Sequence, residues 1–294
     1  MICLTRLGDA ALGPLVERFQ SPKADVRFAA VWGAAMILKD RPPNADVVAA
    51  LERLLDDDQP AVQGAVIRVL ARTELPPEVR TKLAASLLRA WEKNSGDGSR
   101  AYAFRTAVKL GASPEQVVAA TETLLKVGGT PGGGEFAQVA LFAPAGAKLC
   151  ESVVERGISP AGTKVSIDTR LEAFEGVLHL AYAKRCPPQI AAALGKALLD
   201  PEPRVYNRAL QRLRDLGGEA RSAAPHLQQF LAAGRYDSTQ KQIGDAVLGN
   251  IASGASPKAP GSGTVPLVDP PSASPGSSSA PSPAATPAAT LKAM

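Results

Sequence analysis

Three short segments decide the fold: SPKADVR at residues 21–27, DDQPAVQ at residues 57–63, and DPEPRVY at residues 200–206. Each is a polar turn containing proline, followed by a valine that opens an Ala- and Leu-rich stretch. Before the first turn, apolar residues recur at the i, i+3, i+4, i+7 spacing of a helix with one apolar face: Leu12, Leu15, Val16 and Phe19. Val26 and Val62 stand 36 residues apart, which leaves room for two helices and their turns.

Composition agrees with a helical repeat. Of the 294 residues 45% are apolar and 4% aromatic, and 52 alanines and 32 leucines favour helices because these residues lose least on entering one. The alternating Val, Ile, Thr and aromatic runs of a β-sandwich are missing. The sequence therefore predicts an all-α fold, one continuous α-solenoid of about six to seven helix pairs over residues 1–251. Between and after the three segments we expect helices over 77–93, 100–110, 114–127, 138–142, 146–156, 171–184, 188–199, 205–216, 220–231 and 239–251.

The two ends of the chain differ from the repeats. Residues 252–294 hold nine prolines and no aromatic residue, so they bury too little apolar surface to offset the entropy of ordering. We expect a disordered Pro/Ala/Ser-rich tail whose deletion leaves the melting temperature unchanged. Residues 2–9 match the exit of a second helix, as at Leu110-Gly111 and Leu216-Gly217, so the sequence predicts a solenoid that lacks its first helix.

The pattern of polar turn, Asp-Pro, valine and Ala-rich helix resembles HEAT repeats of the short bacterial type, clearly over residues 4–72 and 187–231 and more weakly over 100–186. The resemblance implies a right-handed superhelix in which the second helix of each pair lines the concave side. It also implies binding to other macromolecules; some related proteins handle DNA and others attach bilin chromophores. HEAT repeats join an Asp of the turn to an Arg after the valine. Here each turn keeps half of that pair, and at most Arg27 can reach Asp57 across one junction.

Basic residues gather on the second helices. No Asp or Glu occurs over residues 61–72 or 99–110. If these helices line the inner curve, that curve is basic and suits a partner protein with an acidic surface, or alternatively nucleic acid. In the competing interpretation the arginines extend from solvated faces and pair with neighbouring turns. The candidate binding residues are Arg68, Arg72, Arg100, Arg105, Lys109, Arg204, Arg208 and Arg212.

Other motifs are weaker indications of a functional site. The glycine-rich stretch 128–134 is followed by Glu135 instead of the Lys and Ser/Thr of a phosphate-binding loop, so we expect a flexible loop between helices. The acids at 56–58 lack the ligand spacing of a calcium loop and fit turn chemistry. His179 and His226 have no nucleophile beside them in a triad-like motif, and we expect structural roles for both.

Cys3, Cys150 and Cys186 are too far apart in sequence for a Cys-x-x-Cys motif, so the sequence predicts neither a disulfide framework nor a metal site, and no cofactor. No apolar window reaches the ~18 residues that span a bilayer, and the charged start does not resemble a signal peptide. The sequence thus predicts a cytoplasmic protein without a membrane anchor or small-molecule substrate.

These observations favour a non-catalytic scaffold that mediates protein–protein interaction. The alternative is a nucleic-acid-binding or DNA-handling solenoid that uses a basic concave face. A third hypothesis, an accessory enzyme of the chromophore-lyase type, finds no constellation of Cys, His and acidic residues in support. For the core we expect Val62 and Val205 to be buried within their helix pairs, and Trp32 and Trp91 to lie on apolar faces inside it.

Overall fold

The computed structural model describes residues 8–39, 42–93, 99–142, 144–234 and 236–254. The regular structure of these residues is helical, apart from one isolated antiparallel bridge between Ile158 and Lys164. The predicted all-α fold is confirmed. The predictions for the N-terminal end and for the tail beyond Gly254 lie outside the described residues.

The helices alternate between two layers. The first helices of the pairs are α2 (Leu12–Arg18), α4 (Ala45–Arg53), α6 (Pro77–Lys93), α8 (Pro114–Lys126), α10 (Ala145–Arg156), α12 (Pro188–Ala197) and α14 (Ala224–Ala233). The second helices are α3 (Ala24–Leu38), α5 (Pro60–Arg72), α7 (Ser99–Lys109), α9 (Gly133–Ala140), α11 (Ile167–Tyr182), α13 (Pro203–Leu216) and α15 (Ser238–Ser253). Three 3-10 helices join them: η1 (Gly8–Ala11), η2 (Leu54–Asp56) and η3 (Gly217–Ala223).

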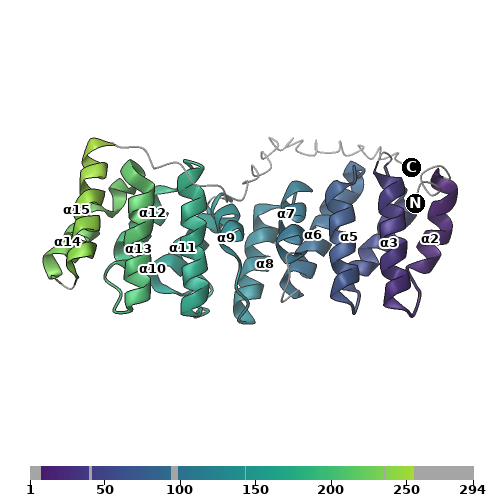
Figure 1. Cartoon of the computed structure of the whole chain (residues 1–294), viewed down its shortest axis with the longest axis horizontal. Helices are drawn as coiled ribbons and strands as arrows, with labels where there is room; N and C mark the ends of the chain where they lie inside the picture. Colours follow the sequence, from purple (N-terminus) through teal and green to yellow (C-terminus); the bar gives the residue numbers. More distant parts are fainter. Residues whose placement is uncertain (1–7, 40–41, 94–98, 143, 235, 255–294) are drawn as a thin grey trace, which may run out of the picture.

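Each layer is continuous from one end of the molecule to the other. In the second-helix layer α3 packs on α5, α5 on α7, and so on to α15, while the first helices pack on one another in the same order. Figure 1 shows the pairs following one another along the longest axis, from α2 at one end to α14 and α15 at the other. Within the described residues this arrangement makes seven helix pairs, so the predicted HEAT-like solenoid is confirmed.

Several helix boundaries differ from the prediction by two residues or more. Helix α11 begins at Ile167, four residues before the expected start at Leu171. Helix α9 begins at Gly133, well before the expected start at Gln138. The stretch at 217–223 is the 3-10 helix η3, so the α-helix expected from Ala220 begins only at Ala224. Helix α15 continues to Ser253, past the expected end at Ile251.

The turn residues explain where the helices start. Pro60 and Pro203 each occupy the first turn of their helix, where the missing amide proton would have had no partner inside the helix. Ser113 caps α8: its Oγ accepts from the Gln116 amide at 3.2 Å, and the Ser113 amide donates to Gln116 Oε1 at 2.8 Å. This is the capping box that the sequence predicts.

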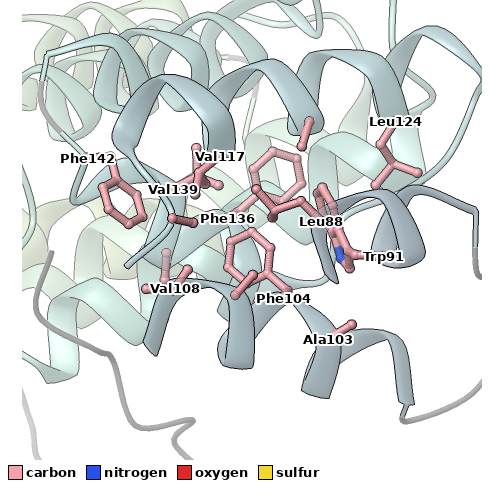
Figure 2. Packing of buried hydrophobic residues seen from close by; sticks show 14 of the residues in the cluster. Leu88, Trp91, Ala103, Phe104, Val108, Val117, Leu124, Phe136, Val139 and Phe142 are labelled. Carbon is pink, nitrogen blue, oxygen red and sulfur yellow. The ribbon is translucent and has the colours of Figure 1, made fainter. Parts of the chain in front are cut away.

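The core runs unbroken between the layers. Val62 and Val205 are each 1% exposed, as predicted. Trp91 is fully buried against Phe104, with ring centroids 5.0 Å apart, among residues of α6, α7, α8 and α9 (Figure 2). The prediction for Trp32 is wrong, because 36% of this side chain is exposed.

Shortening a valine that opens a second helix should weaken the solenoid. We expect Val62→Ala or Val205→Ala to lower the free energy of unfolding by about 1–3 kcal/mol, through lost apolar burial and a residual cavity. Urea denaturation followed by circular dichroism measures this change. An unaltered unfolding midpoint in both variants would mean that the valines do not anchor the repeat.

Two buried ion pairs join consecutive repeats. Arg27 donates to Asp57 through Nε at 2.7 Å and Nη2 at 2.8 Å, which confirms the predicted contact. In the second pair, which was not predicted from the sequence, Arg170 donates to Asp200 at 2.6 Å. Each pair joins residues 30 positions apart, so both are rungs of the same Arg–Asp ladder.

The first rung should make stability depend on pH. Burial raises the pKa of Asp57, but hydrogen bonds from Arg27 and the Gln59 amide outweigh it and hold the pKa below the usual 3.8. A lowered folded-state pKa gives stability that is present above the unfolded pKa and lost as the pH falls through the folded one. We therefore expect the stability gap between wild type and Asp57→Asn to shrink from about pH 5 to about pH 3. Denaturation curves across this range measure the gap; a constant gap would contradict the assignment.

The glycine-rich segment connects α8 to α9 up to Gly132, as predicted, but Gly133 and Gly134 belong to α9, which the prediction of a loop missed. Gly133 lies in α9 against α11, where an added Cβ would come within 2.6 Å of the Glu175 Cβ. On α11, a Cβ added to Gly176 would lie 2.8 Å from the Phe136 Cβ and 2.9 Å from the Gly133 carbonyl oxygen. The glycines therefore allow the backbones of α9 and α11 to approach closely.

Candidate functional site

The eight predicted cations fall into three environments. On α13 the arginines pair with carboxylates: Arg204 donates to Asp168 at 2.6 Å, and Arg208 donates to Glu175. Arg212, whose side chain is 9% exposed, pairs with both Glu175 and Asp215. Helix α11 supplies two of these acids, so the α13 stripe is neutralised and does not form the expected basic surface.

Two further cations lie on aromatic rings. The Arg100 guanidinium carbon is 5.5 Å from the centre of the Trp91 ring, and that of Arg105 is 4.8 Å from the centre of the Tyr102 ring. Burial raises the pKa of the nearby Glu135 more than the Gly132 amide and the Arg100 charge lower it. Arg100 therefore packs on the core residue Trp91, whereas Arg105 lies on the Tyr102 ring, which is 46% exposed.

The remaining predicted cations, Arg68, Arg72 and Lys109, are exposed on α5 and α7. Lys39, which follows α3, is exposed beside them. In the described part of the chain neither Arg68, Arg72 nor Lys39 makes a hydrogen bond or ion pair, while the Lys109 Nζ donates to the Ala71 carbonyl at 3.2 Å. These side chains keep their charge available to a ligand.

An apolar stripe on α3 lies next to these cations. Phe28, Trp32 and Met36 occur at i, i+4 and i+8, and are 37%, 36% and 39% exposed. The Phe28 and Trp32 rings meet edge to face with centroids 6.2 Å apart. Large apolar side chains exposed together on one helix are typical of an interaction surface.

The repeat register shows which way this stripe points. With the 36-residue offset, Trp32 is equivalent to Arg68 and Met36 to Arg72. Helix α5 has α3 on one flank and α7 on the other, so its exposed Arg68 and Arg72 project out of the layer. Trp32 and Met36 therefore project outward from the same face of the second-helix layer.

Two adjoining hollows lie on this face. The first, which we call the Trp32 hollow, measures about 180 Å³ and is lined by Trp32, Ala35, Met36, Lys39, Arg68, Val69, Arg72 and Thr73. The second, the Lys109 hollow, measures about 410 Å³ and is lined by Lys39, Leu70, Arg72, Thr73, Glu74, Leu75, Arg80, Lys109 and Leu110. Lys39, Arg72 and Thr73 line both, so the hollows are continuous.

The lining determines what these hollows can do chemically. They combine apolar walls with five cationic side chains and the single acid Glu74. The Thr73 hydroxyl is used within α5, where it donates to the Val69 carbonyl at 2.8 Å. The described lining thus offers binding groups for an apolar and anionic ligand, and no nucleophile paired with a base.

The other motifs are structural in the described chain. Asp56 pairs with Lys93 at 2.6 Å, and Asp58 with Arg27 at 2.5 Å, which is the expected turn chemistry. Burial raises the pKa of the Cys150 and Cys186 thiols, and burial lowers the pKa of the half-buried His179. No group of three His, Cys, Asp or Glu residues in the described ranges could hold a metal ion. None of the described helices is long and apolar enough to cross a bilayer.

The fold and this face define a class of protein, the all-helical repeat solenoid. Residues 12–103 match the family model of HEAT repeats, and this match covers α3, α5 and most of the two hollows. Residues 12–103 are HEAT-like repeats, and the helix pairs that follow them to α15 continue the same solenoid. A search of curated proteins found no sequence relative.

Comparison with solved structures gives loose superpositions. An engineered protein matches with a TM-score of 0.40 at 19% identity, over 85% of this chain and 70% of its own. Computationally designed armadillo repeat proteins for modular peptide recognition match with a TM-score of 0.31 at 15% identity, over 81% and 99% of the two chains. Another designed armadillo repeat protein has a TM-score of 0.33 at 16% identity, over 82% and 99%.

Proposed function

We propose that this protein is a non-catalytic scaffold that binds a partner protein through the outward face of α3, α5 and α7. HEAT and armadillo repeats typically mediate protein interaction, and the described site holds binding groups without catalytic ones. The observation that carries the proposal is the exposed Phe28, Trp32 and Met36 stripe beside the unpaired Arg68 and Arg72.

The residue types on this face are those of a protein interface. Aromatic residues, Met and Arg are enriched at interfaces, and Trp and Arg are prominent among the residues whose truncation weakens binding most. The excess of cations over Glu74 favours a partner that presents carboxylates. The proposal therefore retains the acidic partner that the sequence predicts.

The distribution of free charge favours protein over nucleic acid. A nucleic-acid track requires cations in succession along the backbone of the ligand. Among the eight predicted cations, Arg204, Arg208 and Arg212 are paired with carboxylates, and the exposed ones without a carboxylate or ring partner in the described residues, Arg68, Arg72 and Lys109, lie on the neighbouring helices α5 and α7. A short cationic patch with an apolar stripe matches a protein segment better than an extended phosphate backbone.

Photo-crosslinking tests the proposal. The crosslinking amino acid p-benzoylphenylalanine is placed at Phe28 in one variant and, as a control, at Val127, which is 74% exposed elsewhere on the molecule. We expect a discrete protein adduct from position 28 that survives nuclease and disappears when Arg68→Glu and Arg72→Glu are added. A nuclease-sensitive adduct, or the same adducts from both positions, would contradict the proposal.

A further inference from the structure

Building on the proposed function, we infer that the two hollows bind a linear acidic segment of the partner, with one bulky apolar side chain in the Trp32 hollow and following carboxylates in the Lys109 hollow. The continuity of the two hollows through Lys39 and Arg72 points to this ligand.

The size of the Trp32 hollow limits its occupant to one side chain. An apolar protein cavity of ~150 Å³ accommodates a benzene ring. The hollow measures about 180 Å³ and is bounded by the exposed faces of Trp32 and Met36, so it fits a side chain the size of phenylalanine or leucine. Met adapts its shape to different apolar partners, and Trp offers a broad rigid face.

The Lys109 hollow supplies the charge that fixes the rest of the segment. Lys39, Arg72, Arg80 and Lys109 line it with Glu74 as the one acid. Arg80 Nε donates to the Leu75 carbonyl at 2.8 Å, but the other N–H groups of its guanidinium can still donate to a carboxylate. An extended chain advances ~3.3 Å per residue, so acids within a few residues of the anchor reach this hollow.

The shape of the site favours a linear segment over a folded acidic surface. The Trp32 hollow lies between α3 and α5, and the Lys109 hollow adjoins it at the C-terminal ends of α5 and α7, which suits a single chain that runs from one hollow into the other. A folded surface would place one side chain in the Trp32 hollow only by projecting it beyond its neighbours. The ligand that we infer is therefore an acidic peptide with one apolar anchor residue.

A synthetic peptide tests this inference on the full chain. The probe is a fluorescein-labelled twelve-residue peptide with one phenylalanine followed by four glutamates, and its binding is measured by fluorescence anisotropy. We expect saturable binding that weakens at least tenfold when the phenylalanine is replaced by alanine, and is lost when the glutamates are replaced by lysines. Fluorescence of the exposed Trp32 should shift to the blue on binding, since Trp91 is already fully buried.

Variants connect the binding to the two hollows. Trp32→Ala and Arg72→Glu should each weaken the peptide at least tenfold, whereas Arg221→Glu, a charge reversal at an exposed arginine on η3, should change it less than twofold. Equal binding to all three variants, or no binding of the phenylalanine–glutamate peptide at millimolar concentration, would overturn the inference. A partner crosslinked at Phe28 would then still support the proposed function.

Titration with a single-stranded oligonucleotide of twenty nucleotides distinguishes a peptide ligand from a nucleic-acid ligand. We expect it to bind more weakly than the peptide at physiological salt. Tighter binding that displaces the peptide, falls steeply with salt and is lost in Arg72→Glu would overturn both the inference and the protein-scaffold proposal in favour of nucleic acid.

Discussion

Replacing Arg170 by alanine is expected to lower the free energy of unfolding by about 3–5 kcal/mol, the largest single effect that we predict for this solenoid. The Arg170 side chain is 8% exposed and bridges α11 to the turn before α13. It donates to Asp200 at 2.6 Å and to the Val154 carbonyl at 2.9 Å. Its removal leaves the partly buried Asp200 carboxylate with the Glu202 amide as its remaining donor and takes the arginine donor from the buried Val154 carbonyl, and both groups then carry a penalty of desolvation.

Arg204→Ala is the matched control for Arg170→Ala. Arg204 also makes an ion pair at 2.6 Å, with Asp168, but the two side chains are 57% and 77% exposed. Solvent screens such a pair, so we expect a change below about 1 kcal/mol. Urea denaturation of both variants measures the difference. Equal destabilisation would mean that burial of the Arg170–Asp200 ion pair adds nothing to the free energy of unfolding.

A side chain at Gly176 should disrupt the close contact between α9 and α11. We expect Gly176→Val to lower the free energy of unfolding by about 3 kcal/mol or more, because the atoms that a Cβ would meet include the backbone of α9 and cannot move aside. Denaturant unfolding followed by circular dichroism measures this loss.

Gly249→Val separates crowding from helix propensity. Gly249 lies in α15, also within a helix, and a Cβ there would meet nothing within 4 Å. Valine and glycine differ little in helix propensity, so we expect a change of less than about 0.5 kcal/mol. If Gly176→Val were as well tolerated as Gly249→Val, this would contradict the claim that the glycines are needed for the close approach of α9 and α11.

The fold could be predicted because it depends on local signals that recur. A polar turn, a proline and a valine at fixed offsets specify where a second helix starts, and Val62 and Val205 occupy the predicted core. The start of α9 could not be predicted in this way. Glycine disfavours helix formation when only the local sequence is considered. A glycine is needed at position 133 because α11, far along the chain, packs closely against it.

Part of the proposed site could be predicted, because residue types are visible in a sequence and their partners are not. Arg68, Arg72 and Lys109 carry the expected charge on the outward face, whereas the arginine at 208 shares Glu175 with its neighbour on α13. Comparing residues one repeat apart would have predicted the outward direction of Trp32 and the pairing of Arg170 with Asp200. Trp32 falls 36 residues before the outward Arg68, and Arg170 falls 30 residues before Asp200, as Arg27 does before Asp57.

The central claim is that the face around Trp32 is where this scaffold binds its partner. Calorimetric titration of the partner identified at Phe28 into wild-type protein, Trp32→Ala and the Arg221→Glu control tests it most directly. Trp32 is 36% exposed and the rest of its side chain is covered, so truncation also lowers stability, and circular dichroism must show that the variant is folded at the temperature of the titration. We predict that Trp32→Ala weakens binding by about 30-fold or more, as expected for a central interface tryptophan, while the control binds like wild type. Unchanged affinity in a folded Trp32→Ala variant would contradict the claim.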